Sequence, residues 1–247
     1  MFEFQSHLIF PTHAVPSAGP LPRGAERLSV DSADGYKLAG IYIPADQPAR
    51  HKTLILGFGG NAWNGQDVAE YLHELFPDDE VVVFHYRGYA PSTGSASAES
   101  LIADAPLVYD AAVERVKPAR IVAVGFSIGS GIAAELATTR KLNGLILVTT
   151  FDSLKAVAQS MYPWLPIGPF FDHEIDTAAA LSKVAAPVAL ISAERDEIVP
   201  ADRTEALRPQ VLKLAFDRTI SRAGHNDIYA RSEFQAAMRE ALAVVSR

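Results

Sequence analysis

The chain has 247 residues, of which 49% are hydrophobic and 21% charged, so it can bury one large core and lacks the composition of a disordered protein. Its formal net charge is -7 without a long basic run, which argues against a nucleic acid partner. It contains no cysteine, which excludes disulfide bonds, thiolate metal sites and a cysteine nucleophile.

The N-terminal sequence does not have the pattern of a targeting segment. Residues 1–16 lack a basic stretch followed by a long apolar core, so we expect no signal peptide. No run reaches the roughly 18 uninterrupted apolar residues that a membrane-spanning helix needs. We therefore expect a cytoplasmic protein without a transmembrane segment, built as a single domain over residues 1–247.

The first predicted elements are two strands at 27–32 and 36–44. They are joined by Ala33-Asp34-Gly35, a turn sequence typical of a hairpin. Continuous apolar runs follow, and such runs are typical of strands buried on both faces of a parallel sheet. These runs cover residues 53–58, 81–86, 120–126, 144–150 and 187–193.

Helical patterns alternate with these strands. Pro106, a residue type that can break or kink a helix, lies inside one of them. The alternation predicts an α/β fold: a mostly parallel central sheet, helices on both faces, and antiparallel N-terminal strands at one edge. The predicted helices cover residues 65–76, 99–116, 128–140, 201–208 and 227–245.

Residues 151–183 interrupt the alternation. They include "MYPWLPIGPFFDHEID", which has four aromatic residues and three prolines. We expect this segment to be a short lid over one end of the sheet. The apolar residues that we expect to line a substrate pocket, either here or after the first parallel strand, are Trp63, Met161, Tyr162, Trp164, Phe170 and Phe171.

Ser127 marks a sharp turn from a strand into a helix. In "VAVGFSIGSGIA" it stands between Gly125 and Gly129, two residues away on either side. Residues at these positions crowd each other in such a turn, so glycine fits best. The turn places the serine hydroxyl beyond the carboxyl end of the strand, where ligands bind in open α/β sheets. This G-x-S-x-G pattern predicts a nucleophilic serine.

A nucleophilic serine needs a base and an acid that orients the base. Only His173 and His225 follow Ser127, and His225 lies in a loop before the last helix, where the base is expected. Asp196 follows a strand between serine and histidine and is the predicted acid, with Asp152 as the alternative. We interpret His173 as a lid or surface residue, and the neighbouring Glu194 and Glu197 as surface charges.

The reaction also needs backbone N–H groups that stabilise an oxyanion. The Ile128 N–H lies at the start of a helix, where the helix dipole favours negative charge. The glycine-rich loop "GFGGNAWNG" follows the first parallel strand, and we expect its Asn61 backbone N–H to be the second donor.

Taken in order, "GFGGNAWN", "YRGYAPSTG", "GFSIGSG", "ERDEIVP" and "AGHNDI" resemble the motifs of the α/β-hydrolase superfamily. Within it the chain is similar to the small serine hydrolases with an H-G-N-A oxyanion loop and a Y-R-G-Y-G-x-S-x-G loop. The resemblance covers nearly the whole chain and implies Ser127 as nucleophile, Asp196 as acid and His225 as base. It also implies Asn61 and Ile128 as oxyanion donors.

The chain departs from the subgroup's pattern at several positions. Gly59 and His85 replace the usual histidine and aspartate, and Ala90 replaces a glycine. Ser192-Ala193 replaces a glycine-containing pair ahead of the acid. We interpret Arg87, in the second motif, as a structural residue that fixes its loop by bonding to backbone carbonyls or an acid.

We predict a serine hydrolase that acts on a small-molecule carboxylic ester or thioester through an acyl-enzyme, without metal or cofactor. Two alternatives remain: a peptidase or amidase that uses the same three residues, and a catalytically silent binding protein on this fold. The chain shows no added propeller or large cap to select peptides, and all three catalytic residue types are present. Both observations favour the ester hydrolase.

Overall fold

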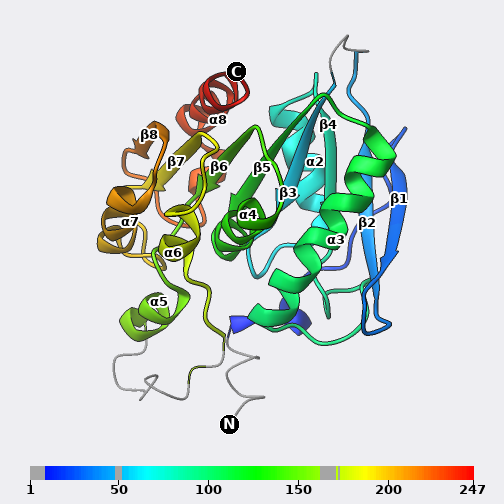
Figure 1. Ribbon diagram of the computed structural model, residues 1–247, viewed down its shortest axis with the longest axis horizontal. Helices are drawn as coiled ribbons and strands as arrows, with labels where there is room; N and C mark the ends of the chain where they lie inside the picture. The colour runs from blue at the N-terminus through cyan, green and yellow to red at the C-terminus, as the bar shows by residue number, and fades with distance from the viewer. Residues whose placement is uncertain (1–8, 48–51, 162–170, 172) are drawn as a thin grey trace.

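The computed structural model describes residues 9–47, 52–161, 171 and 173–247. In these residues eight strands form one sheet in the order β1-β2-β4-β3-β5-β6-β7-β8 (Figure 1). The strands are β1 (Glu26–Asp31), β2 (Lys37–Ile43), β3 (Thr53–Phe58), β4 (Glu80–Phe84), β5 (Arg120–Phe126), β6 (Gly144–Val148), β7 (Val188–Ala193) and β8 (Leu214–Ile220).

The sheet has the predicted α/β arrangement. β1 pairs with β2, and β2 with β4, in antiparallel register, so the N-terminal hairpin forms one edge. Gly35 takes a left-handed φ of 85° in the hairpin turn, a conformation that glycine adopts without steric cost. The strands from β4 through β3 and β5 to β8 pair in parallel. Their carboxyl ends therefore meet at one edge of the sheet.

Helices cover both faces of the sheet, as Figure 1 shows. Alternate residues of the apolar strands serve opposite faces: Leu54 packs with one cluster, which includes α3 and α4, and Ile55 with the other, which includes α2 and α8. This division explains why the strands are continuously apolar. The α-helices are α2 (Gly65–Leu75), α3 (Ala98–Val116), α4 (Ile128–Thr139), α5 (Leu154–Met161), α6 (Thr177–Leu181), α7 (Ala201–Leu207) and α8 (Ser232–Val245), and the 3₁₀ turns are η1 (Thr12–Ala14), η2 (Arg208–Gln210) and η3 (Ile228–Ala230).

The helix predicted at 99–116 is confirmed as α3, which continues through Pro106 because its buried face is held in the core while the proline removes only one backbone hydrogen bond. Other predicted boundaries were wrong. The predicted strand at 144–150 ends at Val148, where Thr149 takes a φ of 46°. The last helix begins at Ser232 rather than at 227, because η3 precedes it.

The sequence patterns also missed β8. This edge strand has only three consecutive apolar residues before three polar ones, and all but Ile220 are exposed or half-exposed, so it lacks the long apolar run of the inner strands.

The segment 151–183 contributes two helices in the described residues. α5 lies beyond the sheet in Figure 1, and α6 packs against α4. Between them, Tyr162, Trp164 and Phe170 lie outside the described residues. Across the described ranges, every helix is too short or too polar to traverse a lipid bilayer.

Candidate active site

Ser127 occupies a strained turn between β5 and α4. Its φ of 51° and ψ of −120° are unfavourable for a residue with a side chain, and such strain is typical of functional sites. A Cβ on Gly125 would lie 2.4 Å from the carbonyl oxygen of Gly129, and one on Gly129 would lie 2.3 Å from that of Phe58. The turn thus requires both glycines, as the spacing predicts.

The structure brings Ser127, His225 and Asp196 together at the carboxyl ends of the strands. Nε2 of His225 lies 3.1 Å from Oγ of Ser127. Nδ1 of His225 lies 2.9 Å from both carboxylate oxygens of Asp196. His225 is 5% exposed, and the Asp196 side chain is 4% exposed, so solvent barely reaches the histidine–carboxylate contact. The geometry fits proton transfer from the hydroxyl to the imidazole.

Backbone amides fix the Asp196 carboxylate. Its Oδ1 accepts hydrogen bonds from the N–H groups of Ile198 and Val199 at 2.9 and 2.7 Å. The alternative acid, Asp152, instead accepts a hydrogen bond from Arg203 at 3.3 Å.

Glu194 and Glu197, which we interpreted from the sequence as surface charges, accept hydrogen bonds from backbone N–H groups of the loop that carries His225. Oε2 of Glu197 accepts the backbone N–H of His225 at 3.1 Å, and Oε2 of Glu194 accepts that of Arg222 at 2.6 Å. The hydrogen bond from Arg222 lowers the pKa of Glu194. The two carboxylates therefore tether the loop that carries His225, a role that their spacing in the sequence does not reveal.

The other histidine after Ser127 lies apart from this arrangement. His173 is buried, and its ring packs edge-on against Phe10 with centroids 5.4 Å apart. This placement matches its interpretation as a packing residue of the lid segment.

The residues of the predicted oxyanion donors, Asn61 and Ile128, line the same cavity as Ser127. A Cβ on Gly60 would be 3.8 Å from Cβ of Ser127, so the loop after β3 packs against the serine. Within the described chain, neither the Asn61 N–H nor the Ile128 N–H has a hydrogen-bond acceptor. The Asn61 side chain donates to the carbonyl of Ile9 at 2.9 Å, so its backbone rather than its amide is available to a ligand.

A cavity of about 490 Å³ opens beside Ser127 and His225. Trp63 and Met161 line it, as predicted, whereas Phe171 is not among its described lining residues and lies against His173. No described residue of the lining has an Asp, Glu, Lys or Arg side chain. The apolar members of the lining are Ile9, Ala62, Trp63, Ile128, Phe151, Leu154, Val157, Ala158, Met161, Ile198, Val199 and Tyr229.

Aromatic rings form one wall of this cavity. The Trp63 ring lies 5.4 Å from that of Phe126 and 5.2 Å from that of Tyr229, centroid to centroid. Burial raises the pKa of Tyr229 to about 12, so its hydroxyl is neutral at physiological pH. The wall is therefore uncharged.

Comparison with known proteins identifies the family. The sequence profile of the alpha/beta hydrolase fold matches residues 54–171. The chain is 32% identical over 222 residues to the uncharacterized protein Rv2307c of Mycobacterium tuberculosis, a match that covers 86% of this chain and 78% of the relative. This chain is an α/β hydrolase by family.

Solved structures share the α/β-hydrolase fold. An alpha-beta hydrolase from Vibrio vulnificus has a TM-score of 0.77 at 16% identity, over 99% of this chain and 93% of that one. The esterase Pf2001 of Pyrococcus furiosus has a TM-score of 0.71 at 19% identity, over 93% and 94% of the two chains. At these identities the likeness concerns the fold.

Arg87, a residue of the second motif, and His85, a departure from the subgroup's pattern, both have structural partners. Arg87 pairs with Asp104, through Nε and Oδ2 at 3.0 Å, and with Asp34, which agrees with its interpretation as a structural residue. Nδ1 of His85 accepts the backbone N–H of Gly65 at the start of α2, at 3.1 Å. Burial lowers the pKa of His85 to about 4, helped by the positive charge of Arg27, so the ring is neutral and able to accept.

The described residues contain no group of three or more His, Asp or Glu side chains arranged to hold a metal ion. The chemistry that the arrangement of Ser127 and His225 can support is nucleophilic attack by a hydroxyl with a histidine as base.

Proposed function

We propose that this protein is a serine hydrolase that cleaves carboxylic esters or thioesters through an acyl-enzyme. The observation that carries the proposal is the continuous contact from Oγ of Ser127 through the His225 imidazole to the Asp196 carboxylate. The α/β-hydrolase family and the fold shared with the Pyrococcus furiosus esterase support it.

In the first step, Oγ of Ser127 attacks the acyl carbonyl while Nε2 of His225 takes its proton. Asp196 holds the imidazole with Nδ1–H toward the carboxylate and stabilises the positive charge that develops on the ring. The negative charge on the carbonyl oxygen is stabilised by the backbone N–H groups of Asn61 and Ile128. The imidazolium then protonates the alcohol or thiol as it leaves, and the acyl group stays on Ser127.

In the second step, His225 takes a proton from water as the water attacks the acyl-enzyme. The tetrahedral intermediate uses the same two N–H donors and collapses to the carboxylic acid, and His225 returns the proton to Ser127. Asn226 and the apolar residues of α5 lie around the same cavity, next to the reacting centre.

The cavity favours an uncharged acyl group. Its described lining is apolar apart from the catalytic and loop residues, so a carboxylate or ammonium on the acyl chain would be desolvated without a partner. Leu154, Val157 and Met161 of α5 present a continuous apolar side to such a chain.

The test is hydrolysis of p-nitrophenyl esters from acetate to palmitate, together with the matching acyl-CoA thioesters and anilides. We expect turnover of esters or thioesters, with kcat lowered on the order of 10⁶-fold in Ser127→Ala and in His225→Ala. Faster cleavage of anilides than of the matching esters would instead indicate an amidase. A folded protein that cleaves none of the substrates would contradict the proposal and favour a silent binding protein.

A further inference from the structure

The oxyanion loop, residues 57–65, is held by the hydroxyls of two tyrosines. Both belong to the loop 85–93, which does not line the cavity. The hydroxyl of Tyr86 donates to the carbonyl of Gly59 at 2.8 Å, and that of Tyr89 donates to the carbonyl of Asn61 at 2.8 Å. Between them, the carbonyl of Gly60 accepts the N–H of Trp63 at 3.3 Å. All three carbonyls of the 59–61 segment thus have fixed partners.

These bonds also fix the directions of the N–H groups. In a trans peptide the C=O and the following N–H point to opposite sides of the chain. The peptide group whose N–H belongs to Asn61 carries the Gly60 carbonyl, and the tyrosines hold the peptide groups on either side of it. The orientation of the Asn61 N–H therefore depends on both hydroxyls.

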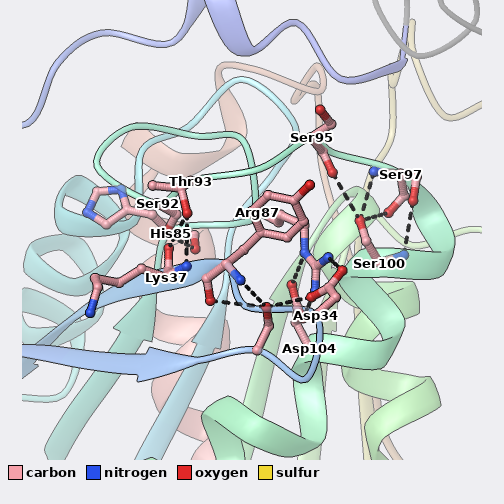
Figure 2. A network of polar contacts seen from close by, with 12 residues as sticks. Asp34, Lys37, His85, Arg87, Ser92, Thr93, Ser95, Ser97, Ser100 and Asp104 are labelled. Atoms are coloured by element: carbon pink, nitrogen blue, oxygen red, sulfur yellow. Dashed lines mark hydrogen bonds and ion pairs between the residues drawn. The ribbon is translucent and has the colours of Figure 1, made fainter.

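The loop that carries the tyrosines, residues 85–93, is anchored by Arg87 on one side. Figure 2 shows Arg87 between Asp34 of the β1–β2 turn and Asp104 of α3. The guanidinium also lies 5.2 Å from the centre of the Tyr36 ring. Arg87 and Asp104 are buried, so this contact is weakly screened by solvent.

Strand β2 anchors the other side of the same loop (Figure 2). Oγ of Ser92 donates to the carbonyl of His85 and accepts the N–H of Ala39, both at 2.9 Å. Oγ1 of Thr93 accepts the N–H of Lys37 at 2.9 Å. The loop is thus joined to β2 and α3, which form part of the rigid frame of the sheet.

We infer that Tyr86 and Tyr89 are positioning residues for catalysis, and that loop 85–93 is a buttress that sets the oxyanion hole. The inference rests on the proposed function, since it assigns the two hydroxyls a role in stabilising the oxyanion at Ser127. Neither hydroxyl touches the substrate; each acts through the backbone of residues 59–61. Burial raises the pKa of both tyrosines, so both hydroxyls stay protonated and continue to donate across the working pH range.

The test compares Tyr86→Phe and Tyr89→Phe with the matched control Tyr109→Phe. The Tyr109 hydroxyl also donates to a backbone carbonyl, that of Lys141 at 2.9 Å, but on the exposed side of α3 away from the cavity. Each variant removes one oxygen atom and one hydrogen bond. The measurements are kcat and KM for the best p-nitrophenyl ester, the affinity for a trifluoromethyl ketone that forms a tetrahedral adduct, and hydrogen–deuterium exchange of the peptide that covers 57–66.

We expect kcat to fall about tenfold in each of the two variants and roughly a hundredfold in the double variant, which is at most the cost of losing one donor completely, on the order of 10²–10³. KM should change less than twofold, the ketone should bind more weakly in proportion to kcat, and amides of residues 57–66 should exchange faster. Tyr109→Phe should match the wild type in all four. A purely structural role would lower the melting temperature and leave kcat and ketone affinity of the folded protein unchanged.

The inference is overturned if both tyrosine variants match Tyr109→Phe in kcat and ketone affinity while the wild type is active. If the wild type cleaves no substrate, the proposed function fails and the catalytic role of the tyrosines fails with it. The exchange data distinguish failure of the inference from failure of the proposed function. Unchanged exchange of the 57–66 peptide in both tyrosine variants would show that loop 85–93 does not act as a buttress, whatever the activity.

Discussion

A methyl group at Gly129 would press the start of α4 against the oxyanion loop. The Cβ of Gly129→Ala would lie 2.3 Å from the carbonyl oxygen of Phe58 and 2.5 Å from that of Gly59. Both atoms belong to backbone, which cannot swing aside as the end of a side chain can. The two segments must therefore separate, and the residues that move are those on either side of the oxyanion.

The size of the effect follows from this displacement. Ordinary contact between carbon and oxygen needs a separation of about 1 Å more than the backbone leaves, and misplacement of that size costs on the order of 10² in rate. Overpacking of a core typically costs about 1–3 kcal/mol of unfolding free energy, which lowers the melting temperature of a chain of this length by roughly 2–12 °C.

The matched control is Gly131→Ala, two residues further along α4. Its Cβ would meet the Ile175 side chain at 2.5 Å, and its three nearest atoms belong to Ile175, Thr177 and Phe151 rather than to the oxyanion loop. Steady-state kinetics with the best ester and thermal unfolding should show lowered stability in both variants, but a kcat loss near a hundredfold only in Gly129→Ala. Equal kcat in the two variants would refute the reasoning that links this glycine to the oxyanion loop.

Three further perturbations test other parts of the site. Asp196→Asn should leave the fold intact and lower kcat on the order of 10⁴-fold, because the histidine would lose the partner that fixes its tautomer; kcat within tenfold of the wild type would exclude Asp196 as the acid. The pKa of His85 is about 4 in the folded chain and 6.5 ordinarily, so the unfolded chain takes up this proton first as the pH falls. Stability is therefore complete above about pH 6.5, and about 3 kcal/mol of it is lost on the way to pH 4. His85→Asn keeps an acceptor for the Gly65 N–H without this titration, so urea unfolding from pH 7 to pH 4 should show a smaller loss in the variant; parallel losses would contradict the assignment. Val157→Phe should fill the α5 side of the cavity and lower kcat/KM for long acyl esters at least tenfold relative to acetate, and an unchanged chain-length profile would place the acyl chain elsewhere.

The fold could be predicted from the sequence where a strand is a continuous apolar run. The apolar runs at 53–58 and 120–126 are strands with the predicted bounds, because both faces of the parallel sheet are covered. Edge strand β8 has one exposed side, so its mixed sequence carries no comparable signal. The helical pattern at 99–116 predicts α3 despite Pro106, because tertiary packing holds the helix together with one hydrogen bond missing.

The candidate site was predictable where chain order and turn chemistry constrain it. Ser127, Asp196 and His225 each follow a strand, and parallel strands bring these ends to one edge. The tyrosine hydroxyls and the Glu197 tether depend on which carbonyl or N–H lies within about 3 Å. That proximity is set by tertiary packing between segments distant in the chain, so no local pattern reports it.

The most direct test of the account is to treat the protein with a fluorophosphonate and locate the adduct by mass spectrometry. The reagent phosphonylates a serine only where a base and an oxyanion hole activate it. We predict one adduct, on Ser127, whose formation slows at least a thousandfold in His225→Ala and is absent in Ser127→Ala. An unmodified Ser127 in folded wild-type protein, or labelling that is independent of His225, would contradict the assignment of this site as a serine hydrolase centre.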